Sequence, residues 1–182
     1  MEIKDGRTGL SAEVNDQNQL MTRAVVEARP SYISATKGEA WTVVADDPDV
    51  AEAEYLIWLK NTGTTPIVIN TIFTSNVDAN VVWKLHTVTG TGGTAAAITP
   101  MNLNLSSGND AIVSCNGGAG GVSGLTSTGV ITSWMGGVAY FNQTINLWLD
   151  ALILSTNDAI ALEFDAGTGS RAIATIMFHN KY

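Results

Sequence analysis

Short runs in which apolar and polar residues alternate are the main feature of this chain. The alternation is clearest in Ala159–Asp165, where Ile160, Leu162 and Phe164 share one face. A period of two predicts half-buried β-strands. Runs of the same kind are Leu20–Ala28, Ala40–Ala45, Tyr55–Lys60, Pro66–Phe73, Val81–Thr87, Ala97–Leu105, Ala111–Cys115, Gly129–Trp134, Ile145–Leu154 and Arg171–His179. Strands of this length, separated by turn residues, predict an all-β antiparallel sandwich or barrel.

Two details modify this picture. Pro100 cannot donate a ladder hydrogen bond, so Ala97–Leu105 is expected at a sheet edge or as a bent strand. The pattern predicts no helix longer than a single turn, and that turn would lie at Asp49–Glu54.

The start of the chain differs from the rest. Residues 1–20 are polar, with few large apolar side chains, and such a stretch cannot bury enough surface to fold alone. It is either a loose tail or an arm that orders against a partner. We therefore divide the chain into an N-terminal arm with a first strand, residues 1–27, and a β-sandwich domain, residues 28–182.

Charge excludes some classes of partner. The net charge is −8, and the lysines and arginines are scattered singly. Nucleic acids and anionic membranes both require clustered basic residues, so neither is expected as a partner. No secretion signal and no apolar run of about 20 residues is found, so we expect synthesis in a cytoplasm and no membrane span.

Residues that could carry chemistry are few. His86 and His179 lie in separate strand patterns without a second ligand at metal-binding spacing, and Cys115 is the only cysteine. Ser123 lies in a glycine-rich loop that lacks the Gly-x-Ser-x-Gly pattern of a nucleophile elbow. The sequence therefore predicts no catalytic residue, no metal site and no cofactor.

Two groups of carboxylates need an interpretation. The acidic run Asp46–Glu54 lacks the spacing of a calcium loop and is expected to be a solvated loop. Glu163 and Asp165 lie two apart in a strand, so they face the same side. We interpret that side as the outward face of the strand; a pair of glycosidase acids is the alternative.

Three aromatic residues are candidates for binding. Most of the five tryptophans share their strand face with aliphatic residues and are expected in the core. Trp148 instead shares its face with Asn146 and Asp150, and Trp134 and Tyr140 lie in a glycine-rich stretch nearby. Aromatic side chains dominate interface anchors and stack on sugars. We expect these three at a subunit interface or, alternatively, on a glycan-stacking platform.

Two regions carry a resemblance to a known group of proteins, and Asn116–Gly137 matches it less well. The matching residues are Lys4–Gly9, Ala12–Val14, Asn18–Leu20, Ala24–Glu27, Tyr55–Asn61, Gly93–Thr94, Ile98–Asn104 and Ala174–His179. Together they resemble head-decoration or cement-like virion proteins of phages, which have a short polar N-terminal arm and a jelly-roll body. The resemblance implies a jelly-roll-like sandwich, no enzymatic activity, and a place on the capsid surface.

The resemblance also implies partners. These are the major capsid protein and further copies of the chain, commonly as a homotrimer. On this basis Gly6, Arg7, Thr8, Gly9 and Arg23 are the expected capsid contacts, with the arginines as charge-assisted donors. The alternative function is a carbohydrate-binding or host-adhesion module of a tail or fibre.

Overall fold

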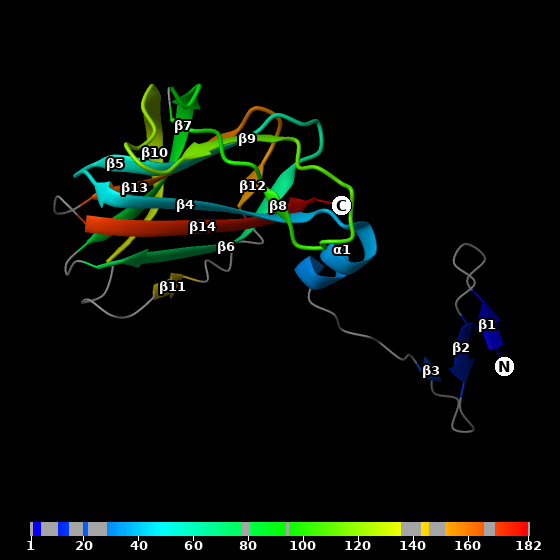
Figure 1. The fold of residues 1–182 in the computed structure, drawn as a ribbon. Helices are drawn as coiled ribbons and strands as arrows, with labels where there is room; N and C mark the ends of the chain where they lie inside the picture. Colours follow the sequence, from blue (N-terminus) through cyan, green and yellow to red (C-terminus); the bar gives the residue numbers. More distant parts are fainter. Residues whose placement is uncertain are drawn as a thin grey trace.

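The computed structural model of the chain is a two-layered β-sandwich with one short helix (Figure 1). The structure describes residues 2–4, 11–14, 20–21, 29–77, 81–93, 95–135, 143–145, 152–165 and 170–181. The prediction of an all-β antiparallel sandwich is confirmed.

The elements follow each other in a simple order. Three short strands, β1 (Glu2–Lys4), β2 (Ser11–Val14) and β3 (Leu20–Met21), precede helix α1 (Arg29–Lys37). The strands of the body are β4 (Ala40–Val50), β5 (Glu54–Asn61), β6 (Ile67–Asn76), β7 (Val82–Gly90), β8 (Met101–Asn102), β9 (Val113–Gly117), β10 (Leu125–Met135), β11 (Gln143–Ile145), β12 (Ile153–Leu154), β13 (Ala159–Asp165) and β14 (Ser170–Asn180).

The strand order is that of a jelly roll. One sheet has the order β10-β7-β13-β5-β9, and the other has the order β11-β6-β14-β4-β8, with β12 also paired to β6. The antiparallel pairs β4–β14, β5–β13, β6–β11 and β7–β10 are nested in sequence, and their members are distributed over the two sheets as in two interlocked Greek keys. The jelly-roll body is therefore present.

The main core lies between the two sheets. Trp83 and Leu85 of β7 point inward, as do Ile160, Leu162 and Phe164 of β13, so the predicted faces of these strands are confirmed. Phe164 lies opposite Trp83 in the ladder, and the two rings meet edge to face with centroids 5.2 Å apart. Side chains at alternating positions thus close the sandwich from both sheets.

The connection between β7 and β10 forms an insertion, residues 91–124, that adds a strand to each sheet. Its strand β8 pairs with β4, and its strand β9 pairs with β5. Only Met101–Asn102 of the predicted strand Ala97–Leu105 forms a ladder, and it lies at the end of its sheet, as Pro100 indicated. Outside that strand, Ala97 forms an isolated bridge with Asn116, and the N–H of Ile98 donates to the carbonyl oxygen of Cys115.

Helix α1 is a correction to the sequence interpretation. Its turns contain no apolar stripe, since Ile33 is its one buried hydrophobic residue among those described, and periodicity therefore gave no signal. Gly38 ends the helix with a φ of +62°, and its N–H donates to the carbonyl of Ser34. No helical turn forms at Asp49–Glu54, where the sequence allowed at most a single one: β4 runs to Val50, and a tight turn leads directly into β5.

Two further regions refine the predicted elements. Strands β1, β2 and β3 pair with one another in a small antiparallel sheet, so part of the N-terminal arm has secondary structure of its own. Of the predicted strand Leu20–Ala28 the structure describes only β3, and residues 22–28 lie outside the described part. The predicted strand Ile145–Leu154 is represented by its two ends, in β11 and β12, with residues 146–151 outside the description.

Candidate functional site

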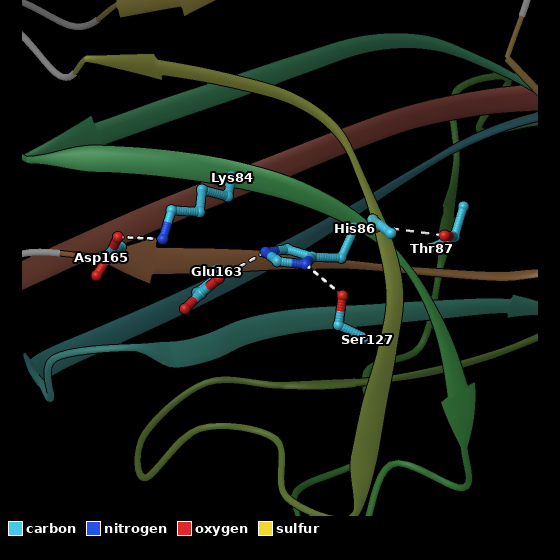
Figure 2. Close-up of polar contacts among 7 residues, drawn as sticks. Lys84, His86, Thr87, Ser127, Glu163 and Asp165 are labelled. Atoms are coloured by element: carbon cyan, nitrogen blue, oxygen red, sulfur yellow. Dashed lines mark hydrogen bonds and ion pairs between the residues drawn. The ribbon is translucent and has the colours of Figure 1, made fainter.

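A cluster of polar side chains occupies the outer face of the sheet formed by β5, β13, β7 and β10 (Figure 2). Because Leu162 and Phe164 point into the core, their neighbours on β13 point outward. The same alternation on β7 turns Lys84 and His86 to this face. The cluster consists of Tyr55, Lys84, His86, Ser127, Glu163 and Asp165.

His86 is the centre of the cluster. Its Nδ1 lies 2.8 Å from the hydroxyl oxygen of Ser127, and its Nε2 lies 2.5 Å from a carboxylate oxygen of Glu163. The side chains of His86 and Glu163 are only 7% and 12% exposed. The contact between Nε2 and the carboxylate of Glu163 is short, but its angle is not that of a hydrogen bond. The imidazole is thus held between a hydroxyl and a carboxylate at the sheet surface.

Lys84 and Asp165 form a second pair beside the first. Lys84 is directly opposite Glu163 in the ladder, and its ammonium reaches along the strand to the carboxylate of Asp165. Both side chains are about 30% exposed. The hydrogen bond with Asp165 raises the pKa of Lys84, since it favours the charged amine. The two acids of β13 therefore share one face, as predicted, but each contacts a different basic side chain.

Tyr55 completes the cluster from β5. Its ring meets the imidazole of His86 edge to face, with centroids 5.5 Å apart. Burial raises the pKa of Tyr55, and the charge of Glu163 raises it further, whereas a hydrogen bond with Ser127 acts in the opposite direction. The phenol therefore stays protonated at neutral pH.

The connection Ser127–His86–Glu163 resembles the order of a catalytic triad, but its geometry differs from one. In the serine-protease triad the serine contacts Nε2 and the acid orients Nδ1 through an aligned hydrogen bond. Here Ser127 contacts Nδ1, and the carboxylate of Glu163 is not aligned on Nε2. The arrangement links strands β7, β10 and β13 through their side chains.

The acidic run at the end of β4 is only partly a solvated surface. Asp46 is exposed and forms two hydrogen bonds with Arg171, which lower the pKa of its carboxyl group. Asp47 is only 1% exposed and accepts hydrogen bonds from the backbone N–H groups of Asp49 and Gly120. The expectation that this run is a solvated loop is therefore wrong at Asp47, because its position on β4 faces inward like Val43 and Ala45.

Exposed apolar side chains gather on one part of the insertion, which we call the apolar segment (Met101–Ile112). Leu105 is 86% exposed, and Met101, Leu103 and Ile112 are also exposed. Contiguous exposed apolar side chains are typical of protein-binding surfaces, and these four lie within one short segment of the chain.

Asparagine side chains fasten the apolar segment to the end of α1. Asn102 donates to the carbonyl oxygens of Gly38 and Asn109, Asn104 donates to that of Ser34, and Asn109 donates to that of Lys37. The bond from Asn109 to Lys37 also satisfies one of the carbonyl groups at the end of the helix. The apolar side chains are thus displayed on a fixed backbone, next to the helix that follows the N-terminal arm.

The predicted contact residues have different outcomes. The expected capsid contacts Gly6, Arg7, Thr8, Gly9 and Arg23 lie outside the described residues, as do Tyr140 and Trp148. Trp134 is partly buried against the main core, and its indole N–H donates to the hydroxyl of Thr74 at 3.3 Å. Its role at an interface stays a prediction. The apolar segment was missed because its exposure depends on side-chain hydrogen bonds to a helix that sequence reasoning did not foresee.

The described residues also bear on metal binding and on membrane crossing. They contain no group of three or more histidine, cysteine or acidic side chains placed to hold a metal ion. No helix among them has the length and apolarity needed to cross a bilayer. No family model, curated protein or solved structure matches this chain.

Proposed function

We propose that this chain is a non-enzymatic structural protein of a phage particle that binds the major capsid protein at the capsid surface. The observation that carries the proposal is the apolar segment, which hydrogen bonds hold against the C-terminal end of α1. Jelly rolls are frequent in viral capsid proteins and in lectins, and the resemblance of the arm and body to decoration proteins favours the former.

The physics of the apolar segment suits protein binding. Its backbone is fixed before binding, so little conformational entropy is lost when Leu103 and Leu105 are buried. Asp110 is the only charged residue between Leu85 and Leu149, in a chain of net charge −8. Cores of protein interfaces are depleted of charged residues, and this segment meets that condition.

The arm and the body would act together. A single contact of the arm is expected to be weak, whereas a homotrimer that carries three arms and three apolar segments binds with an avidity about 10²–10⁴ higher. Bridging neighbouring capsid subunits in this way opposes their separation. The function of the protein would then be to stabilise the particle.

The test is co-sedimentation of the purified chain with undecorated capsids. We expect Leu105→Asp and deletion of residues 2–19 each to weaken binding by at least about tenfold, as the loss of a central contact does. Val130→Asp serves as the control, since Val130 is an exposed apolar residue of β10 outside the apolar segment. Full binding by both variants, or absence of binding by the unmodified chain, would overturn the proposal.

A further inference from the structure

A glycine-rich loop covers part of the outer face of the β5-containing sheet. We call it the glycine loop (Gly118–Val122). Its backbone N–H groups at Gly118 and Val122 donate to the carbonyl oxygens of Leu56 and Tyr55 on β5. Val122 is buried with Trp58, Val88, Ala159 and Ala161 in a second apolar cluster, separate from the main core. The loop therefore keeps apolar surface of the sheet away from water.

Two carboxyl groups lie under the glycine loop. Asp47 accepts a hydrogen bond of 2.8 Å from the N–H of Gly120, which joins the loop to β4. Glu54, the first residue of β5, lies against Gly121 so closely that a Cβ at that position would be 2.2 Å from the Cγ of Glu54. Gly121 also has a φ of +59°, which favours glycine.

Glu54 lacks a partner for one of its oxygens. Its Oε2 accepts a hydrogen bond from the N–H of Ala51, whereas its Oε1 is buried without a partner. A buried carboxylate oxygen without a donor is costly, and a proton on it removes the cost by turning acceptor into donor. The oxygens of Asp47 beside it are the acceptors that such a proton would meet.

The charges that act on Glu54 also favour its protonated form. Burial raises the pKa of Glu54 most, and hydrogen bonding to Asp47 and the negative charges of Asp47 and Asp49 raise it further, while the N–H of Ala51 lowers it. Arg171 is paired with Asp46, which points to the opposite face of β4 from Asp47. No basic group acts on Glu54 from the described surroundings.

We propose that Glu54 and Asp47 form a proton-operated latch, which holds the glycine loop closed over the second apolar cluster and loosens it as the pH rises. Below the ordinary pKa of a glutamic acid the proton is bound with the loop open or closed, and the closed loop has its full stability. As the pH rises through the raised pKa the closed loop loses its proton, and two adjacent buried carboxylates repel each other. The latch therefore responds to mild changes in acidity.

The sharpest test is hydrogen exchange of the Gly120 and Val122 amides in the full chain, corrected for the intrinsic effect of pH on exchange. We expect protection of these amides to fall severalfold between pH 4.5 and pH 8, because the closed loop binds the proton of Glu54 more tightly than the open loop does. Glu54→Gln, which keeps the shape without the charge, should hold protection constant over this range. Asp46→Asn is the matched control and should behave as the unmodified chain does.

An independent measurement covers the case in which Glu54→Gln does not fold. The carboxyl carbon of Glu54, followed by NMR in the unmodified chain, should titrate above the ordinary range of glutamate side chains. Titration of Glu54 within that ordinary range, or amide protection that does not change with pH, would overturn the latch.

Discussion

Gly117 of β9 lies against the backbone of Leu56 on β5, with space for a hydrogen atom and not for a methyl group. A Cβ at position 117 would be 2.6 Å from the carbonyl oxygen of Leu56 and 3.2 Å from the Cβ of Ala45 on the opposite sheet. Because both obstacles are parts of the sandwich framework, neither can move aside cheaply. The close approach of β9 to β5 therefore depends on glycine at this position.

This relationship gives a stability prediction. We expect Gly117→Ala to lower the free energy of unfolding by about 1–3 kcal/mol, the usual cost of overpacking. Gly108→Ala is the matched control, since a Cβ at position 108 would meet no atom within 4 Å, and it should change stability by less than about 0.5 kcal/mol. Urea denaturation followed by circular dichroism measures both; equal effects of the two changes would contradict the prediction.

Loss of the His86–Glu163 contact should destabilise the fold more than loss of the Lys84–Asp165 ion pair. His86→Ala removes the contacts of Glu163 and Ser127 with the imidazole and is expected to cost about 1–3 kcal/mol of unfolding free energy. Lys84→Ala breaks an ion pair that is screened by water, and it should cost less than about 1 kcal/mol. Chemical denaturation of both variants at neutral pH tests this order, and a reversed order would refute it.

Asn102 should control the rigidity of the apolar segment. Asn102→Ala removes donors from the carbonyl oxygens of Gly38 and Asn109 and an acceptor from the N–H of Asn104. We expect a loss of about 1–3 kcal/mol and faster hydrogen exchange across Leu103–Asn109. Thr156→Ala, in the turn before β13, is a control at an exposed polar residue. Unchanged exchange in Asn102→Ala would show that the segment is held by other contacts.

Cys115 should be unreactive in the folded protein. Burial raises the pKa of its thiol to about 12, so the reactive thiolate is roughly a thousandfold rarer at pH 8 than for a thiol with a pKa near 9. A colourimetric thiol reagent should therefore label the chain slowly in buffer and at once in concentrated guanidinium chloride. Rapid labelling of the folded chain would place Cys115 in contact with solvent and contradict its burial.

The alternation of apolar and polar residues predicted the strands well where all residues on one side of a strand meet the same environment. In β13 and β7 the residues Leu162, Phe164, Trp83 and Leu85 point inward, as their spacing indicated. The sequence could also place Glu163 on the outward side. It could not show that His86 would meet Glu163, because that contact depends on the register between two strands that are about 75 residues apart.

The failures have a common physical cause. Helix α1 has no periodic apolar face, and its position is supported by hydrogen bonds from Asn102, Asn104 and Asn109 in a distant loop. Asp47 is buried in spite of its charge because the glycine loop supplies a backbone donor to it. Both features depend on tertiary contacts that override local preference, and no local pattern records them.

The insertion between β7 and β10 has a consequence for the behaviour of the protein at high concentration. Without β8 and β9, the long strands β4 and β5 would be the outermost strands on one side of each sheet, with their main-chain groups open to a neighbouring chain. Such open borders template the growth of intermolecular sheets. A strand of two residues and a strand of five residues now stand in their place and offer far less to pair with. This insertion therefore protects both sheets against edge-to-edge aggregation. Shortening it would expose the edges of β4 and β5 together.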